Sequence, residues 1–347
     1  MTSAPSNSSK PPAPEPAVSS FSKAGQYSPT WFDRPLFDRL RQERQLRWGR
    51  PLRLFDELGS TNDEALEAFR NQVPNGAVFC AYEQHSGRGR RGNAWHAPPG
   101  DSLALSLVLR LPVNFHQSAG LSLLVGLALC LTLEPRLSAP VSMKWPNDIM
   151  VNEKKLGGIL VEGRFQGQQL GAIVGIGINT QLKEFPPHLE GRATSLRAQG
   201  ASSRNTAHEP LMIDLLASLE SLVPNFLLKG LESFHPEIQA LNFLRGKSVW
   251  ISDAQVENGA PPEATRERQE KRDDQRPSGS LLNPARAKMQ DSALQDSALQ
   301  DSTLHGTVEG ITPQGYLELQ TADAFIEVRS GHIEKISSPQ EPPGMTR

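Results

Sequence analysis

A run of glycines and arginines between Glu83 and Trp95 has the strongest chemical character in this chain of 347 residues. It reads Glu-Gln-His-Ser-Gly-Arg-Gly-Arg-Arg-Gly-Asn-Ala-Trp. Glycines allow positive φ and a close approach of the backbone to a ligand, and arginines supply permanent positive charge. Backbone N–H groups and guanidinium groups together suit a carboxylate or a phosphate. The run therefore predicts an anion-binding loop.

The same run matches G-x-G-x-x-G, the dinucleotide-binding fingerprint, and this match needs a test. The fingerprint follows a strand, opens a helix and reaches an acidic residue about 20 positions later. Residues 77–84 predict the strand, but Pro98 and Pro99 follow the glycines closely, and residues 102–110 predict another strand where the helix should be. No acidic residue stands in the required place. The sequence therefore argues against a dinucleotide-binding fold.

Two further stretches carry glycines or polar groups inside predicted strands. Lys144 to Glu162 contains Lys-Trp-Pro-Asn-Asp and, after a turn, Lys-Leu-Gly-Gly-Ile-Leu-Val-Glu. It predicts a hairpin with its turn at residues 152–154, and glycines inside the second strand indicate a close approach to the backbone. Gly175 to Asn179 predicts a strand of the same kind, for which a simple bulge is the alternative.

The tripeptide Ser60-Thr61-Asn62 lies between a predicted strand at residues 52–58 and a predicted helix from Glu64. Residues of these types are common helix N-caps, and capping is the simplest interpretation. One cap needs only one side chain. Three adjacent polar side chains are equally suited to a polar ligand with both donors and acceptors.

Composition limits the class of protein. The length is enough for two modest domains, and a net charge of −2 argues against a dedicated nucleic-acid surface. Cys80 and Cys130 lie in apolar runs far apart, so we expect core residues in a reducing compartment. The first 22 residues lack the apolar segment of a signal peptide. The apolar run at residues 119–133 is too short to span a bilayer.

Outside these motifs the sequence predicts a tail, several helices and a small barrel. Residues 1–28 are rich in Pro and Ser and are expected to be disordered. Helices are predicted at residues 31–46, 117–133 and 210–234, the last kinked or broken near Pro224. Antiparallel barrel strands are predicted at residues 247–252, 306–309, 315–320, 324–329 and 332–336. Residues 253–304 contain two Gln-Asp-Ser-Ala-Leu repeats and one Gln-Asp-Ser-Thr-Leu repeat, which indicates a disordered insertion in this barrel.

The motifs, in this order and together with Gly175 to Asn179, resemble those of biotin protein ligases, also called biotin–[acetyl-CoA-carboxylase] ligases. The resemblance runs from about Leu52 to Leu244 and continues less sharply through the barrel. It implies an α/β (α+β) catalytic domain similar to class II tRNA synthetases at residues 29–245, followed by an SH3-like barrel at residues 246–337. It also implies that biotin and MgATP give biotinyl-5′-AMP and pyrophosphate. The biotinyl group then passes to one lysine of a biotin carboxyl carrier protein.

The resemblance also implies roles for individual residues. Expected catalytic residues are Lys155, Arg90 and Asp148. Expected biotin-binding residues are Ser60, Thr61, Asn62, Gln84, Arg88, Gly89, Arg90, Lys155, Gly157 and Gly158. Expected adenylate-binding residues are Arg88, Trp95, Lys155 and Asn179.

The reaction brings a carboxylate against a triphosphate. These two anions repel each other. The positive charges of Arg88, Arg90, Lys155 and Mg²⁺ would offset the repulsion. Asp148 is expected either to help hold the metal or to orient the incoming lysine amine. No covalent nucleophile is required, and the sequence has no Ser-His-Asp or Cys-His pattern.

The remaining expectations concern metals, partners and alternatives. His85 and His96 lack partners at metal-ligand spacing, so no metal held by protein side chains alone is expected. With no helix-turn-helix before the catalytic domain, we expect a monofunctional, cytoplasmic enzyme, a monomer or weak homodimer, that binds neither DNA nor membrane. The alternatives are a lipoate or octanoyl ligase or transferase of the same fold, and a non-catalytic biotin-sensing regulator. The Lys-Trp-Pro-Asn-Asp segment favours biotin.

Overall fold

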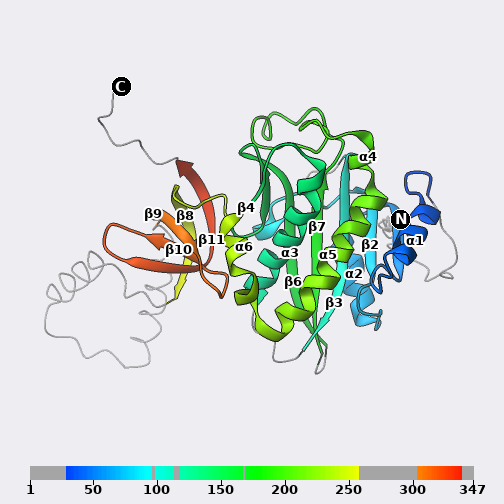
Figure 1. Ribbon diagram of the computed structural model, residues 1–347, viewed down its shortest axis with the longest axis horizontal. Coiled ribbons are helices and arrows are strands. Elements are labelled where there is room, and N and C mark those ends of the chain that lie inside the picture. Colours follow the sequence, from blue (N-terminus) through cyan, green and yellow to red (C-terminus); the bar gives the residue numbers. More distant parts are fainter. Residues whose placement is uncertain (1–28, 96–97, 113–117, 167–168, 258–302, 338–347) are drawn as a thin grey trace, which may run out of the picture.

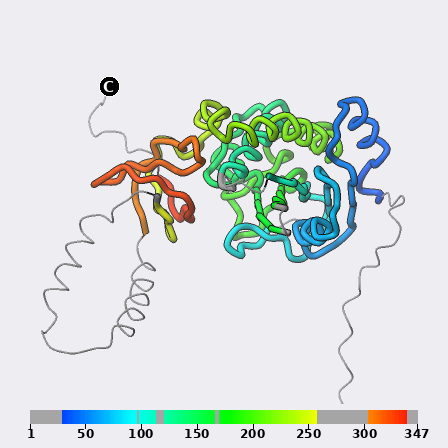
Figure 2. The backbone as a smooth tube through the Cα atoms, turned by 90° about the horizontal axis from the view of Figure 1, so that it is seen from below, coloured from blue at the N-terminus to red at the C-terminus, as the bar shows by residue number. Residues whose placement is uncertain are grey.

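The computed structural model describes residues 29–95, 98–112, 118–166, 169–257 and 303–337. The predicted tail at residues 1–28 and residues 258–302 of the predicted insertion lie outside these ranges. The described chain forms a seven-stranded sheet with helices on both faces, and a closed four-stranded barrel. The barrel lies at one end of the molecule and helix α1 (Arg34–Glu43) lies at the other (Figures 1 and 2).

The large sheet has the strand order β1-β2-β3-β7-β6-β5-β4. Its strands are β1 (Leu52–Leu58), β2 (Val78–Gln84), β3 (Ser102–Leu111), β4 (Val141–Lys144), β5 (Asp148–Val151), β6 (Lys154–Gln166) and β7 (Gln169–Asn179). Neighbours β1 and β2 are parallel, and every other neighbouring pair in this sheet is antiparallel.

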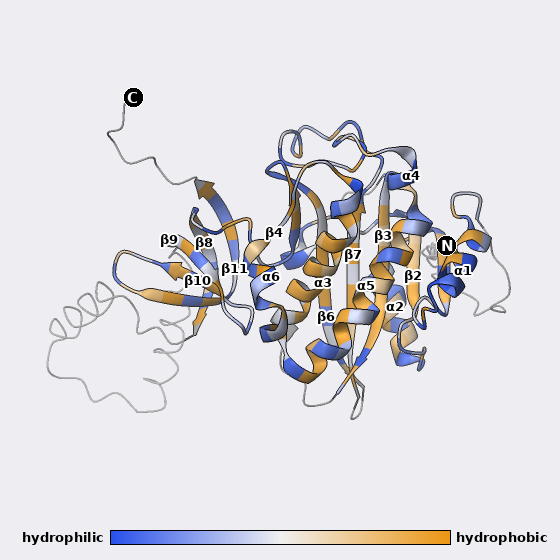
Figure 3. Ribbon diagram, viewed as in Figure 1, coloured by the Kyte–Doolittle hydropathy of each residue, from blue (hydrophilic) through white to orange (hydrophobic). Residues whose placement is uncertain are grey.

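The two faces of the sheet are covered unequally. Helices α3 (Ser118–Leu133) and α5 (His208–Lys229) pack together on one face, over a large apolar core that includes Val174 and Ile176 of β7. Figure 3 shows that α3 is predominantly hydrophobic. The other face carries α2 (Thr61–Arg70), which at ten residues is about 15 Å long. Ile173 of β7 packs in the smaller core cluster on the α2 side.

Period-2 alternation therefore places Gly175 and Gly177 on the same face as Ile173. Because α2 is short, part of this face stays uncovered. The functional site lies there.

The remaining helical elements are short. They are α4 (Ser203–Thr206), α6 (His235–Ala240) and the 3₁₀ turns η1 (Arg90–Gly92), η2 (Glu134–Arg136) and η3 (Leu231–Phe234). The predicted hairpin is confirmed: β5 and β6 pair antiparallel around a turn in which Asn152 and Glu153 have φ of 48° and 63°. Such a turn, with φ positive at both central residues, matches the twist of a tight hairpin.

Helix α5 corrects the predicted break near Pro224. It continues through Pro224 and ends at Gly230, whose φ of 72° suits glycine. The structure overrides the local effect of proline because residues such as Leu216, Leu219 and Val223 are buried in the core. Among the described helices, α5 alone has the length and hydropathy that could cross a membrane, and here it packs against α1 and α3.

The barrel has four described strands, where five were predicted. They are β8 (Ser248–Glu257), β9 (Leu304–Ile311), β10 (Leu317–Gln320) and β11 (Phe325–Ser337). The two strands predicted at 324–329 and 332–336 are one continuous strand, β11, with register shifts against β8 in place of a turn. Strand β8 runs five residues beyond the predicted 247–252, so residues 253–257 of the predicted insertion are strand.

Hydrogen bonds fix the barrel to the larger part of the molecule. Trp145 Nε1 donates to the carbonyl of Gly315 at 3.1 Å. From α6, His235 Nε2 lies 2.7 Å from the carbonyl oxygen of Ile311, and Gln239 Nε2 donates to the same oxygen at 2.9 Å. Trp145 is buried, and it also lines the site described below.

Two leucines one turn apart on α3 test the account of the core. Leu127 is 1% exposed and Leu131 is 47% exposed. We expect Leu127→Ala to lower the free energy of unfolding by about 2–5 kcal/mol, because it leaves a cavity in a close-packed core. Leu131→Ala is the control and should cost far less. Denaturant unfolding measures both, and equal losses would contradict the assigned packing.

A second prediction concerns His208, at the start of α5. Burial lowers the pKa of His208 to about 4 from its usual 6.5. Between these values the unfolded chain binds a proton that the folded chain does not, so stability falls as pH falls from about 6.5 to 4. The full effect is about 3 kcal/mol. In His208→Gln this part of the pH dependence should disappear in denaturant unfolding, and an unchanged pH profile would refute the assignment.

Candidate active site

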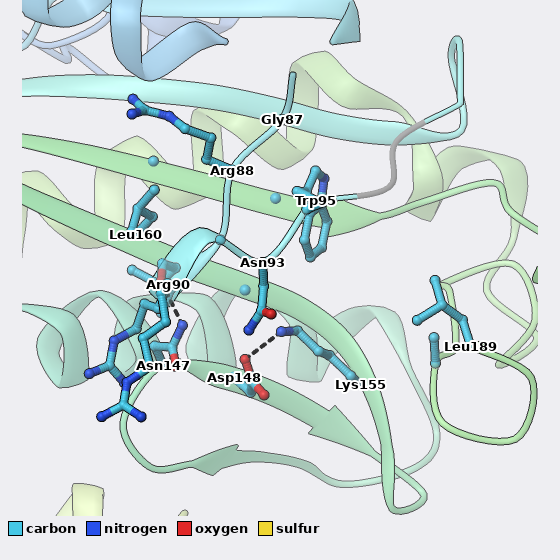
Figure 4. Close-up of a pocket in the computed structure, with 18 of the residues that line it drawn as sticks. Gly87, Arg88, Arg90, Asn93, Trp95, Asn147, Asp148, Lys155, Leu160 and Leu189 are labelled. Carbon is cyan, nitrogen blue, oxygen red and sulfur yellow. Dashed lines mark hydrogen bonds and ion pairs between the residues drawn. The ribbon is translucent and has the colours of Figure 1, made fainter. Parts of the chain in front are cut away.

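A cavity of about 1540 Å³ lies on the uncovered part of the sheet, between the Gly87–Trp95 loop, the β4–β5 turn and barrel strand β11. Figure 4 shows the loop and the β5–β6 side of this cavity. The predicted site residues that line it are Ser60, Thr61, Asn62, Gln84, Arg88, Gly89, Arg90, Trp95, Asp148, Lys155 and Gly158. These residues come from β1–α2, β2, the loop, β5 and β6, so the fold brings together segments nearly 100 residues apart. Lys144, His188, Arg192 and Lys247 add further basic groups to the wall.

Two predicted residues, Gly157 and Asn179, are not among those that line the cavity. Gly157 neighbours Gly158 on β6 and so faces the opposite side of the sheet. Asn179 is buried, with its Oδ1 accepting from Ser102 Oγ at 3.2 Å and its Nδ2 donating to the Thr194 carbonyl at 3.0 Å. It holds a loop onto the end of β7.

The Ser60-Thr61-Asn62 corner forms a buried polar cluster. Ser60 occupies the N-cap position of α2 but makes no side-chain capping bond, so the simple capping interpretation does not hold for it. Thr61 N and Oγ1 both donate to Gln84 Oε1, at 2.8 and 3.2 Å. Asn62 Nδ2 donates to Glu162 Oε2 at 2.8 Å.

Ser106 completes this cluster, and the sequence analysis missed it. Its Oγ lies 2.8 Å from Thr61 Oγ1 and 2.5 Å from Asn62 Oδ1, and it is fully buried. The signal was a single serine inside the otherwise apolar run Leu103–Leu109 of β3. The cluster offers both donors and acceptors in a buried setting, and it suits a small polar head group.

Glycines of β7 make room for two side chains of the site. A Cβ at Gly175 would lie 2.4 Å from Asn62 Oδ1, and a Cβ at Gly177 would lie 2.5 Å from the Trp95 ring. Both contacts are too close for any other residue. Trp95 therefore lies on the sheet, with its ring centre 5.8 Å from Lys155 Nζ. Its Nε1 is buried without a hydrogen-bond partner among the described residues, so it is free to donate to a ligand.

The loop is a compact turn closed by its own backbone. Gly89 N donates to Asn93 O at 2.7 Å, and Trp95 N donates to Gly87 O at 2.8 Å. At its tip is the 3₁₀ turn η1, with no longer helix, so the argument against a dinucleotide-binding fingerprint is confirmed here. Figure 4 shows Arg88 and Arg90 leaving the loop in different directions.

A bulge aims Lys155 into the cavity. Strands β5 and β6 shift register so that Ile149 pairs with Gly157 but Met150 pairs with Lys155. Without this extra residue, alternation would place Lys155 on the side of Gly157; with it, Lys155 lies beside Gly158. The Lys155 backbone is fixed on both sides, since its N–H donates to Arg192 O at 2.9 Å and its carbonyl accepts from Thr194 N at 2.8 Å.

Carboxylates balance the cations around the cavity. Lys155 Nζ lies 2.6 Å from Asp148 Oδ1 (Figure 4). Arg88 Nη2 lies 2.6 Å from Asp63 Oδ1 and 3.3 Å from Glu162 Oε2. Glu162 therefore joins the loop to the polar corner, a role that the sequence analysis did not assign to it.

Two further cations are partly desolvated. Burial lowers the pKa of Arg90, the neighbouring Arg91 lowers it further, and Asp148 opposes both effects. Burial likewise lowers the pKa of Lys144, and Asp148 again opposes the effect. Asp148 is thus shared by several cations. Their positive charge is not fully neutralised by it, and this favours the binding of an anion in the cavity.

Comparisons with known proteins agree with this geometry. The sequence model of the Biotin/lipoate A/B protein ligase family matches residues 54–179. The chain is 42% identical over 199 residues to the biotin–[acetyl-CoA-carboxylase] ligase of Paracoccus denitrificans, covering 56% of this chain and 77% of that protein. The chain belongs to the biotin protein ligase family.

Other relatives are matched over a smaller part of their length. The bifunctional ligase/repressor BirA of Bacillus subtilis is 35% identical over 151 residues, which cover 43% of this chain and 46% of that protein. The chain thus spans about half the length of these bifunctional ligases.

A solved structure supports the fold. The biotin protein ligase from Aquifex aeolicus, in complex with biotin and ATP, matches with a TM-score of 0.60 at 24% identity. The match covers 83% of this chain and 99% of that one. The predicted fold class, an α/β domain followed by a small barrel, is confirmed.

Gly177 provides a test of how Trp95 is placed. We expect Gly177→Ala to force the indole off the sheet, at about 1–3 kcal/mol of strain or displacement. Acrylamide quenching of the Trp95 emission, isolated by difference with Trp95→Phe, should increase. Gly163→Ala is the matched control, because a Cβ there meets nothing within 4 Å. Unchanged quenching in Gly177→Ala would mean that the indole does not rest on β7.

Proposed function

We propose that this protein is a biotin–protein ligase that forms biotinyl-5′-AMP from biotin and MgATP and transfers biotin to a lysine of a biotin carboxyl carrier protein. One observation carries the proposal: a buried polar corner and a group of cations face the same cavity. Family membership supports the same activity.

The polar corner suits the ureido ring of biotin. This ring carries one carbonyl acceptor and two N–H donors, and the side chains of Ser60, Thr61, Asn62 and Ser106 offer hydroxyl and amide groups of both kinds. Leu160, which pairs with Gly175, lines the same cavity and would contact the apolar part of the ligand. Because the corner groups are already buried, their desolvation cost is met on folding and they are preorganised for binding.

The cations suit the other end of the ligand. Adenylation requires the biotin carboxylate to attack the α-phosphate while pyrophosphate leaves, so two anions must meet. Lys155, Arg90 and Arg88 would lower this repulsion and stabilise charge on the transferring phosphate. The unpartnered Trp95 Nε1 would donate to an oxygen of the nucleotide.

Transfer needs only a free amine. The carrier lysine, once deprotonated, attacks the acyl carbon; the acyl–phosphate C–O bond breaks, AMP leaves, and the proton passes to solvent or to a nearby base. Asp148 lines the cavity beside Lys155 and is placed to orient the amine. The cysteines take no part, because burial raises the pKa of Cys80, and raises that of Cys130 to about 12.

Magnesium enters this proposal as part of the substrate MgATP. The described residues contain no group of three or more His, Cys, Asp or Glu side chains that could hold a metal ion. Mg²⁺ bound mainly by phosphate oxygens and water needs only one or two protein carboxylates, and Asp148, 2.6 Å from Lys155 Nζ, would supply one. As further parts of the proposal, the enzyme is cytoplasmic, a monomer or weak homodimer, and acts without DNA; the net charge of −2 supports the last point.

The direct test is to incubate the protein with biotin and MgATP and to look for biotinyl-AMP by mass spectrometry. Lipoate in place of biotin should give no lipoyl-AMP. Lys155→Ala should slow adenylate formation about 10²- to 10³-fold, because it removes a preorganised cation from the transition state. Lys154→Ala, one residue away but exposed at the start of β6, is the control and should react normally.

Two outcomes would contradict the proposal. If the wild-type protein forms lipoyl-AMP and no biotinyl-AMP, the substrate is wrong. If Lys155→Ala releases pyrophosphate at the rate of the Lys154→Ala control, the assigned role of Lys155 is wrong.

A further inference from the structure

Arg91, at the tip of the Gly87–Trp95 loop, contacts the barrel through an ion pair that spans 162 residues of sequence. Its Nη1 lies 2.7 Å from Asp253 Oδ2, and its Nη2 lies 3.4 Å from the carbonyl oxygen of Asp253. The guanidinium thus contacts both the side chain and the backbone of one residue. The Arg91 side chain is 34% exposed and the Asp253 side chain is 69% exposed, so the pair lies at the surface with only its arginine partly covered.

Both partners have positive φ, a backbone conformation that residues other than glycine rarely adopt. Arg91 has φ of 56° and Asp253 has φ of 48°. Asp253 lies within β8, beside a register shift of β11, where Ser252 pairs with His332 and Gln255 pairs with Ser330. This irregularity turns the strand locally, as bulges do. Two rare conformations meeting at one ion pair indicate that surrounding structure holds both residues in place.

The barrel is a fixed support for this contact. Trp145 and α6 bond it to the larger part of the molecule at Gly315 and Ile311. On its opposite side the loop is held by Arg88, which pairs with Asp63 and Glu162. The loop is therefore fixed at two points, once to the sheet domain and once to the barrel.

We propose that Arg91 and Asp253 form a strap that holds the loop against the barrel and thereby positions Arg90 over the cavity. They are positioning residues, since they act through the loop. Arg90 precedes Arg91 in the same 3₁₀ turn, so a shift of one moves the other. The consequence for retention of the adenylate rests on the proposed function, whereas the strap itself does not.

Hydrogen–deuterium exchange of the full chain without ligand tests the strap. Asp253→Asn removes the charge but keeps a residue type that tolerates positive φ, and Arg91→Gln removes the other charge. Each should speed exchange in residues 87–95 by about 2- to 5-fold, the range for a partly exposed pair. The double variant should match either single variant, because each already breaks the pair. The melting temperature should stay within about 2 °C of wild type.

Arg39→Gln is the matched control. It removes an exposed ion pair with Glu43 in α1, far from the loop, and should leave exchange at 87–95 unchanged. The charge swap Arg91→Asp with Asp253→Arg should recover part of the protection. Wild-type exchange in both single variants, or additive effects in the double variant, would overturn the strap.

Measuring the release of biotinyl-AMP distinguishes a failure of the strap from a failure of the proposed function. With biotin and MgATP, the single variants should release free biotinyl-AMP faster than wild type, at a nearly unchanged biotin affinity. If wild type makes no biotinyl-AMP but the exchange pattern appears, the proposed function fails and the strap stands. If wild type makes biotinyl-AMP and exchange is unaffected, the strap fails alone.

Discussion

The site depends on holding several positive charges together around one cavity. Lys155, Arg90 and Lys144 all lie near Asp148, and the 2.6 Å pair between Asp148 and Lys155 is the closest of these contacts. Like charges at this density repel, and burial lowers the pKa of Arg90 and of Lys144. One carboxylate does not neutralise three cations. The fold therefore holds a site whose electrostatics improve when an anion enters, and this is what the adenylation of a carboxylic acid requires.

The large sheet makes this arrangement possible by leaving part of one face open. Helices α3 and α5 cover one face, whereas short α2 covers only part of the other. Because Gly175 and Gly177 have no side chains, Asn62 and Trp95 lie directly against the backbone of β7. The β5–β6 bulge then moves Lys155 to this face. Each device is local, but the cavity exists only because all of them act on the same face.

The sequence predicted the motifs of this site better than the contacts between them. Motif order identified the loop, the polar corner and the hairpin, because glycines, caps and turns have local signatures. Gly157 was included with Gly158, although alternation along a strand separates their faces. Ser106 and Glu162 were missed because their roles come from contacts with segments 44 to 100 residues away.

The barrel shows the same limit. The sequence predicted separate strands at residues 324–329 and 332–336, but pairing with β8 keeps β11 continuous through register shifts. Pro224 suggested a break in α5, but burial of its neighbours keeps the helix intact. Asp253 lay in a segment of low-complexity composition, yet it contacts the loop. In each case tertiary pairing decided what local composition could not.

The most direct measurement of the central claim is a crystal structure of the full chain with a non-hydrolysable biotinyl-adenylate analogue. The account predicts the ureido ring against Thr61, Asn62 and Ser106. It also predicts Lys155 Nζ within about 3 Å of an oxygen at the junction of the acyl and phosphate groups. An analogue bound outside this cavity, or bound inside it with Lys155 and Arg90 both away from that junction, would contradict the account.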